Sequence, residues 1–224
     1  SGGSFTKKFS HEFQIVTLAG EDLILACPSC TFAQNAEIAT VKEGDACPQC
    51  SATLAIVKGV EAGNIFDLGK KFSEVFKTDF TDEDGKRQTA FMGCYGIGTT
   101  RLVGAIVEAS HDERGIIWPK SVAPMPIHLV SLSSKDASVQ SRISETAQSI
   151  YEDLAKEGIE VLWDDRNAST GEKLADADLL GLPLRLLVSE KTLKEESVEW
   201  KLRASSEVQL VKLEDVLSSL LARL

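Results

Sequence analysis

The spacing of apolar residues predicts mainly β-structure in the first half of the chain. Apolar and polar positions alternate in residues 12–26, which predicts two strands, and again in residues 52–68. Two glycines, Gly59 and Gly63, interrupt the second stretch, and we expect the chain to turn at both of them.

A hairpin and a helix are expected next. The dipeptide Asp84-Gly85 is a strong signal for a tight turn, and it leads into an apolar strand. After Gly98 the apolar residues recur at helical spacing instead. The residues that carry this spacing are Leu102, Val103, Ile106 and Val107. The first part is therefore predicted to be α+β, an antiparallel sheet with one helix packed on it.

The pattern changes after three prolines that lie between residues 119 and 126, and we place a domain boundary near residue 124. The two predicted domains are 1–123 and 124–224. Strands and helices alternate in the second domain, which predicts a mixed α/β sheet covered by helices. The expected elements are strand 127–132, helix 136–157, strand 159–163, helix 170–180, strand 184–189, a strand pair in 198–212 and helix 213–224.

Composition narrows the classes of protein to consider. Formal net charge is −10, which disfavours indiscriminate binding to phosphate backbones, so a nucleic-acid partner would need a local, shaped site. No apolar run reaches the roughly 18–20 residues of a membrane helix, and no basic-then-apolar leader opens the sequence. We therefore expect no membrane association and a cytoplasmic protein, with an organelle matrix as the other possibility.

Four of the five cysteines form two Cys-x-x-Cys pairs. The pairs are separated by 16 residues, which is within the spacing of four-cysteine zinc sites. Four thiolates suit one tetrahedral ion and leave no open coordination position, so the zinc would be structural. Two disulfides or four reduced thiols are the alternatives, and disulfides are disfavoured without a secretory signal. The predicted knuckle spans residues 27–50, with Cys27, Cys30, Cys47 and Cys50 as ligands.

The segment "FMGCYGIGTTRL" at 91–102 places three glycines in six positions. A dinucleotide fingerprint needs a third glycine where Arg101 stands, and a P-loop needs Lys followed by Ser or Thr. Both familiar phosphate-binding motifs therefore fail. Glycines that let a flat base lie on a strand, followed by an arginine that reaches a triphosphate, resemble motif 3 of class II aminoacyl-tRNA synthetases.

Three further segments make the resemblance narrower. "MGCYGIGTTRL" followed by "HDERGIIWPKSVAP" resembles the bacterial-type prolyl-tRNA synthetases, as do "SHEFQ" at 10–14 and "VEAGNIFDLGKKFS" at 60–73. "GIEVLWDDRNASTGEKLADADLLGLP" at 158–183 resembles the core of that family's anticodon-binding domain. These segments follow the family's order and cover nearly the whole chain. The resemblance implies part of a ligase that activates proline with ATP and Mg²⁺ and transfers it to tRNA(Pro).

The resemblance also implies an ATP site. Arg101 would contact the ATP phosphates, while Gly96 and Gly98 would give the adenine-binding strand a flat surface. Glu61 and Asn64 match positions near the ribose. Class II sites act by positioning and charge stabilisation, so no side-chain nucleophile is expected.

Three further residues match the wall of the proline pocket, namely Phe66, Gly93 and Cys94. His11 and Glu12 lie on the neighbouring strand without an assigned role. A nucleophilic role for Cys94 is the alternative, and it is disfavoured because no base lies beside this residue in the sequence.

The sequence departs from the family pattern at two positions. Asn64 stands where many bacterial-type relatives have histidine, which puts the detailed ribose contact in doubt. Thr100 stands where many other class II enzymes place an acid, a change that the prolyl family tolerates.

The second domain would read the anticodon. Polar side chains in the loop after strand 159–163 could reach unstacked bases, although a capped and solvated helix start is the alternative. Asp176 and Asp178 are expected to cap or solvate the helix. The residues expected to approach RNA are Asp165, Arg166 and Lys173, with Asp164 beside them.

Several parts of a class II synthetase find no match in this sequence. They are motif 1, which forms the dimer, motif 2, the Thr-x-Glu loop for the proline amine, and the editing insertion of many bacterial members. We therefore expect a C-terminal part of a homodimeric ligase, inactive alone. A non-catalytic module that binds tRNA or a partner is the alternative; a zinc-knuckle nucleic-acid binder unrelated to synthetases ignores most matching segments.

Overall fold

The computed structural model describes residues 10–222, which form two compact units divided between Ala109 and Ser110. Within the described residues, no helix combines the length and the apolar composition that crossing a bilayer requires.

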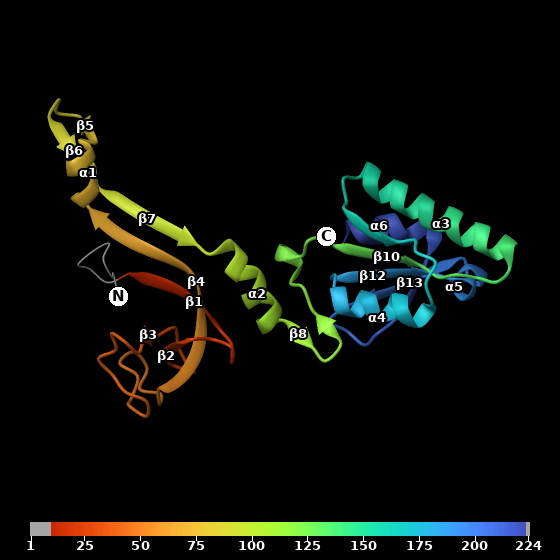
Figure 1. Ribbon diagram of the computed structural model, residues 1–224, viewed down its shortest axis with the longest axis horizontal. Helices are drawn as coiled ribbons and strands as arrows, with labels where there is room; N and C mark the ends of the chain where they lie inside the picture. The colour runs from red at the N-terminus through yellow and green to blue at the C-terminus, as the bar shows by residue number, and fades with distance from the viewer. Residues whose placement is uncertain (1–9, 223–224) are drawn as a thin grey trace. The chain divides into compact units, whose positions relative to one another are not determined.

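The first unit is built around one long strand, β4 (Ala55–Gly69), which pairs antiparallel with three other strands (Figure 1). Its partners are β1 (His11–Val16), β2 (Asp22–Ala26) and β7 (Met92–Ile97), and β3 (Ala33–Asn35) pairs with β2. The remaining elements are helix α1 (Lys71–Phe76), the hairpin β5 (Asp79–Thr81) and β6 (Arg87–Thr89), and helix α2 (Thr99–Ala109). The predicted antiparallel sheet, the hairpin at Asp84-Gly85 and the helix after Gly98 are confirmed.

The predicted turns at Gly59 and Gly63 are wrong, because β4 continues without interruption through both glycines. The missing side chains allow close approach of neighbouring segments instead. A Cβ on Gly59 would lie 2.5 Å from Ile24 Cδ1, and a Cβ on Gly63 would lie 2.9 Å from the carbonyl oxygen of Gly96. A larger residue at Gly63 would push the β7 backbone away, whereas one at Gly59 would displace the Ile24 side chain.

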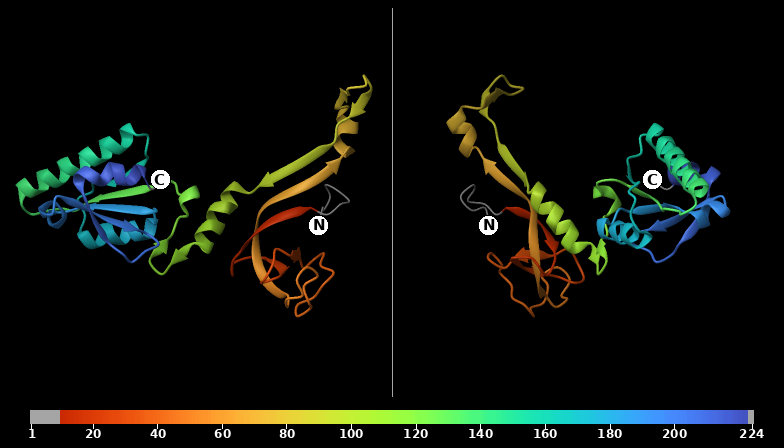
Figure 2. Two further views of the ribbon diagram at one scale, coloured as in Figure 1. Left: turned by 180° about the vertical axis from the view of Figure 1, so that it is seen from behind. Right: turned by 45° about the vertical axis from the view of Figure 1, so that its right-hand side comes forward.

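The second unit contains a five-stranded sheet in the order β11-β10-β12-β13-β14 (Figures 1 and 2). The first three strands are parallel to one another. β13 pairs antiparallel with β12, and β14 pairs antiparallel with β13, so the sheet is mixed as predicted. The strands are β10 (Ile127–Ser131), β11 (Val161–Asp164), β12 (Leu184–Val188), β13 (Ser197–Leu202) and β14 (Gln209–Lys212).

Helices cover both faces of this sheet. Helix α3 (Ala137–Lys156), α5 (Glu190–Lys194) and α6 (Val216–Leu221) enclose the main core on one face, and α4 (Thr170–Leu180) covers the other. The predicted helix 170–180 coincides with α4. The predicted helix 213–224 is instead a short 3₁₀ turn, Leu213–Asp215, followed by α6, and its last two residues lie outside the described part.

Residues 110–123, which the sequence placed in the first domain, lie in the second unit. They form the hairpin β8 (His111–Asp112) and β9 (Gly115–Ile116) and a 3₁₀ turn, Lys120–Val122. The hairpin packs against the carboxyl end of α4, where a Cβ on Gly181 would lie 1.8 Å from the Ile116 carbonyl oxygen. The Trp118 indole N–H also donates a hydrogen bond to the Leu180 carbonyl oxygen at 3.0 Å.

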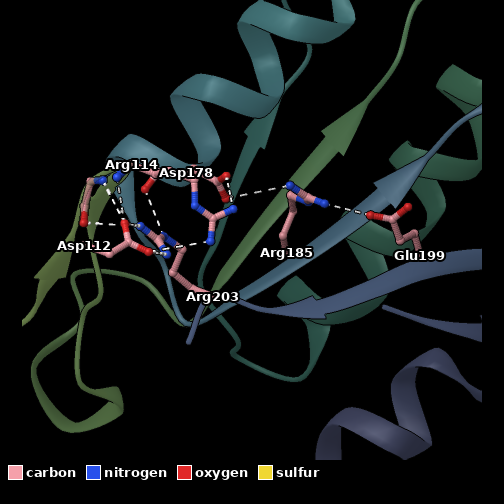
Figure 3. A network of polar contacts seen from close by, with 7 residues as sticks. Asp112, Arg114, Asp178, Arg185, Glu199 and Arg203 are labelled. Carbon is pink, nitrogen blue, oxygen red and sulfur yellow. Dashed lines mark hydrogen bonds and ion pairs between the residues drawn. The ribbon is translucent and has the colours of Figure 1, made fainter. Parts of the chain in front are cut away.

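An arginine fixes this hairpin (Figure 3). Arg203, only 5% exposed, donates hydrogen bonds to the two carboxylate oxygens of Asp112 at 2.6 and 2.9 Å. It also donates to the carbonyl oxygens of Gly115 and Asp178. Arg114 adds an ion pair to the Asp178 carboxylate at 3.0 Å. These contacts join residues that are far apart in the sequence. The local pattern around the three prolines, which placed the domain boundary near residue 124, does not reveal them.

Candidate functional site

The glycine-rich strand β7 leads through Gly98 directly into α2, which carries Arg101 in its first turn. Arg101 Nη1 donates a hydrogen bond to the Glu61 carbonyl oxygen at 3.1 Å and lies 4.0 Å from Glu61 Oε1. The Arg101 side chain remains 57% exposed, so its guanidinium can still meet an anion. The fold thus brings together three of the residues expected at the ATP site.

Strand register adds the other two. Asn64 on β4 lies directly opposite Gly96 on β7, and Glu12 on β1 faces Asn64 from the other side. Nothing lies within 4 Å of the position that a Gly96 Cβ would take, so the strand offers open backbone there. Asn64 is 9% exposed, and its Oδ1 is buried with no hydrogen-bond partner within residues 10–222.

Two pockets adjoin these residues. A polar pocket of about 420 Å³ is lined by Arg101 together with Ala19, Glu21, Asp22, Gly59, Val60 and Glu61. An apolar pocket of about 320 Å³ is lined by Phe13, Ala62, Gly63, Asn64, Ile65, Tyr95, Gly96, Ile97 and Leu102. The first pocket is lined by three carboxylates beside the Arg101 guanidinium, and the second is almost wholly apolar.

The three residues expected at a proline pocket also lie together. Phe66 on β4 is directly opposite Cys94 on β7, and Gly93 pairs with the next β4 residue, Asp67. Phe66 and Cys94 are half-buried. A Cβ on Gly93 would lie 3.0 Å from the Tyr95 hydroxyl oxygen, so the tyrosine ring lies close over this glycine.

The four paired cysteines converge at the ends of two similar turns. Their Sγ atoms all lie within 4.8 Å of one another, with Cys27 and Cys50 at 3.4 Å and Cys30 and Cys47 at 3.6 Å. A tetrahedral Zn²⁺ with bonds of about 2.3 Å to sulfur would separate its ligands by about 3.8 Å. The donor set and its spacing therefore fit a structural zinc ion.

Local hydrogen bonds already favour a thiolate in this cluster. The backbone N–H of Ser29 is the main reason why the pKa of Cys27 falls to about 7. The Phe32 N–H acts in the same direction on Cys30, but burial and the neighbouring thiols outweigh it and raise the pKa of Cys30 to about 12. Ionisation of one of the four thiols thus disfavours ionisation of a second, and a bound cation would remove this repulsion.

In the second unit, the loop after β11 is organised around Asp164. Arg166 donates hydrogen bonds from Nε and Nη2 to the Asp164 carboxylate at 3.0 and 2.8 Å, and from Nη2 to Asp176 at 2.7 Å. The Arg166 hydrogen bond is the main reason why the pKa of Asp164 falls to about 2. Asp164 is buried, whereas Asp165 is exposed and the Arg166 side chain is 52% exposed.

Lys173, expected to approach RNA, is almost fully buried. It is 1% exposed, and its Nζ donates hydrogen bonds to the carbonyl oxygens of Ser131 at 2.8 Å and Asp164 at 3.1 Å. The first turns of α4 are thus not exposed to solvent at Lys173. Asp178, expected to cap or solvate α4, accepts from Arg114 instead.

A pocket of about 520 Å³ opens at the carboxyl ends of β10 and β11. It is lined by Ser131, Ser133, Ser134, Gln140, Ser144, Trp163, Asp165, Arg166, Asn167 and Lys173. The pocket residues contributed by the loop after β10 and by α3 were not among those predicted from the sequence. The signal was present, since ligands of open α/β sheets bind at the carboxyl ends of strands where the crossover direction changes.

Comparison with known proteins agrees with both units. Residues 10–111 match the tRNA synthetase class II core domain (G, H, P, S and T), and residues 126–223 match the anticodon binding domain. The chain is a class II synthetase core fragment followed by an anticodon-binding domain. Ala109 and Ser110, where the two compact units meet in sequence, fall near the end of the core match.

The curated relatives of this core fragment and anticodon-binding domain are proline–tRNA ligases. Those of Dehalococcoides mccartyi strain CBDB1, Geobacter sp. strain M21 and Legionella pneumophila strain Philadelphia 1 are 46%, 46% and 43% identical over 84%, 83% and 81% of this chain. The chain spans about a third (32%) of the length of each relative.

A solved structure has the same fold. Giardia lamblia prolyl-tRNA synthetase, in complex with prolyl-adenylate, superposes with a TM-score of 0.61 at 22% sequence identity. The match covers 71% of this chain and 33% of that one.

Proposed function

We propose that this chain is part of a prolyl-tRNA synthetase that activates proline with ATP and transfers it to tRNA(Pro). The observation that carries the proposal is the β7–α2 junction, where open glycine backbone and an exposed arginine meet Glu61 and Asn64. The identity of 46% to a proline–tRNA ligase over most of the chain supports the same reaction. The chain supplies motif 3 and anticodon recognition, and we expect no activity from it alone.

The ATP site takes its parts from three elements. Arg101 stabilises the phosphates, which arrive with Mg²⁺, while Gly96 and Gly98 leave room for the adenine to lie against the strand. Glu61 and the Oδ1 of Asn64, which has no hydrogen-bond partner among the described residues, face the ribose. The Glu61 carbonyl oxygen orients Arg101 before the nucleotide binds, so less side-chain entropy is lost on binding.

Proline binds against the wall formed by Phe66, Gly93 and Cys94. The aromatic ring of Phe66 gives an apolar contact for the pyrrolidine ring, and the Tyr95 ring closes the space over Gly93. Cys94 lines this pocket as a small half-buried side chain and takes no part in bond making.

The pocket of the second unit receives the anticodon of tRNA(Pro). Asp165 and Asn167 offer acceptors and donors to base edges, and Arg166 is held in place by two carboxylates. Lys173 belongs to the same site, although its burial gives it a different task. A local pocket of this kind answers the difficulty that the net charge of −10 poses for RNA binding.

The four-cysteine cluster holds a structural zinc ion in our proposal. The ion would join the turn after β2 to the segment before β4, where the local core consists only of Cys27, Cys47 and Leu54 with a few half-buried neighbours. So small a core needs an additional crosslink. We further propose a homodimer for the whole enzyme and a cytoplasmic or organelle-matrix location.

Titration of the 224-residue chain with a tRNA(Pro) transcript tests the proposal. Binding at moderate salt should be weaker for a tRNA(Pro) whose anticodon has been replaced, and equal binding would contradict anticodon recognition. Binding of ATP with Mg²⁺ is measured in parallel on Arg101→Ala. The control is Arg142→Ala, which removes an exposed arginine of α3 and should leave ATP binding unchanged.

A further inference from the structure

Lys173 is almost fully buried, and two of its three hydrogen-bond donors are used within the protein. An ammonium group has three N–H donors and no acceptor. Two of its donors go to the Ser131 and Asp164 carbonyl oxygens, and Asp164 Oδ1 lies 3.7 Å away as the third neighbour. At 1% exposure the side chain also presents almost no surface to a ligand.

The two carbonyl groups belong to the last residues of neighbouring parallel strands, β10 and β11. Lys173 therefore joins the strand ends at the point where the chain leaves the sheet. A second link lies beside it, because the Ser131 hydroxyl donates to the Asp164 carbonyl oxygen at 3.2 Å and accepts from the Trp163 indole N–H at 3.2 Å.

The loops that line the pocket start at these strand ends. Ser133 and Ser134 follow β10, and Asp165, Arg166 and Asn167 follow β11. Asp164 accepts from the backbone N–H of Arg166 at 3.2 Å and from its guanidinium. The buried ammonium thus neutralises the carboxylate that in turn fixes Arg166.

A purely structural explanation is less satisfactory. Burying a lysine costs desolvation and side-chain entropy, and apolar residues of similar size often stabilise a buried position more. The strands are also paired already, through the register from Ile127–Val161 to Val130–Asp164. We infer that Lys173 is a positioning residue for the anticodon pocket, which holds the two loops in the RNA-binding arrangement without touching RNA. The inference rests on the proposed anticodon recognition.

The test compares Lys173→Met with Lys135→Met in the full 224-residue chain. Lys135 is exposed in the loop after β10, so its replacement calibrates the effect of losing one positive charge. The Kd for tRNA(Pro) and for the anticodon-replaced transcript is measured at several salt concentrations. For Lys173→Met we expect roughly a ten- to hundredfold rise in Kd for tRNA(Pro), the range seen for coupled networks. The preference between the two RNAs should shrink, and the slope of log K against log salt should stay unchanged.

Loss of a direct phosphate contact would instead lower that slope by about one and weaken both RNAs equally. Either this result or unchanged affinity and preference overturns the inference. Lys173→Arg keeps the charge, but a planar guanidinium does not reproduce two carbonyl acceptors and a nearby carboxylate around a single nitrogen. We expect Lys173→Arg to lose preference as well, and full retention would overturn the inference.

Hydrogen exchange of the Arg166 backbone amide separates this inference from the proposed function. Exchange without RNA should become faster in Lys173→Met and stay unchanged in Lys135→Met, because Lys173, unlike Lys135, forms an ion pair with the Asp164 carboxylate that accepts from this amide. Unchanged exchange in Lys173→Met overturns the positioning role. A lack of preference in the unsubstituted chain overturns anticodon recognition, whatever the exchange result.

Discussion

The contact between Gly181 and the hairpin β8–β9 gives a prediction with a matched control. Gly181 has φ +70° at the end of α4, and an added Cβ would lie 1.8 Å from the Ile116 carbonyl oxygen. Gly158, after α3, has φ +74°, but nothing lies within 4 Å of its Cβ position. Alanine at either site has the same backbone strain, and only Gly181→Ala also displaces the hairpin.

The magnitudes separate the two variants. A left-handed alanine costs about 1–2 kcal/mol, of which the lower unfolded-state entropy of alanine recovers part, so Gly158→Ala should cost about 1 kcal/mol. Forced movement of packed groups adds about 1–3 kcal/mol. The hydrogen bond from the Trp118 backbone N–H to the Gly181 carbonyl oxygen would also be disturbed, which adds about 1 kcal/mol. Gly181→Ala should therefore cost roughly 3–5 kcal/mol.

Urea unfolding followed by tryptophan fluorescence measures the difference. All three tryptophans, Trp118, Trp163 and Trp200, lie in the second unit, so the signal reports its unfolding without a contribution from the first. The expected outcome is a clearly lower midpoint for Gly181→Ala than for Gly158→Ala at similar slopes. If the two free energies of unfolding agreed within about 0.5 kcal/mol, the hairpin would not pack against the end of α4 as described.

Three further predictions concern charge and metal. Because the Arg203 hydrogen bonds lower the pKa of Asp112, the folded state binds fewer protons there, and this stabilisation is lost as pH falls below about 4. Urea midpoints of Asp112→Asn should be lower than those of the unsubstituted chain at pH 7 and change less below pH 4; parallel curves would contradict this. Burial is the main reason why the pKa of His128 is lowered. Stability should therefore fall as pH drops below about 6.5. His128→Gln should give a flatter midpoint curve between pH 7 and 5, whereas an unchanged slope would exclude His128 as the cause. The purified chain should contain about one zinc per molecule by elemental analysis, and Cys47→Ser should contain far less with an unaltered tryptophan unfolding curve. Equal zinc in both would exclude the cluster as the site.

Local patterns predicted local structure well, and contacts between distant residues limited the rest. The hairpin at Asp84-Gly85 and helix 170–180 depend on turn and capping chemistry within a few residues, and both are present as expected. The turn predicted at Gly59 failed because the glycine serves a close approach by Ile24, which no local pattern reveals.

The candidate site shows the same limit. The motif around Gly96 and Arg101 was visible as a sequence, and strand pairing then placed Asn64 opposite Gly96. The burial of Lys173 could not be foreseen, because a lysine in the first turns of a polar helix is ordinarily solvated. Its acceptors, Ser131 and Asp164, come from two other strands and become neighbours only in the folded sheet.

The pairing of β2 with β4 defines a natural insertion point in the first unit. Ala26, the last residue of β2, lies directly opposite Ala55, the first residue of β4, so the segment between them, which carries the edge strand β3 and the four cysteines, begins and ends at neighbouring positions. Two paired residues of this kind are separated by only about 5 Å. The entropic cost of closing a loop also grows slowly with its length. The segment can therefore be exchanged for a short turn or for an entire folded domain while the pairing of β4 with β1 and β7 keeps its register. Architecture at this position can change in evolution independently of the strands that carry Asn64 and Gly96.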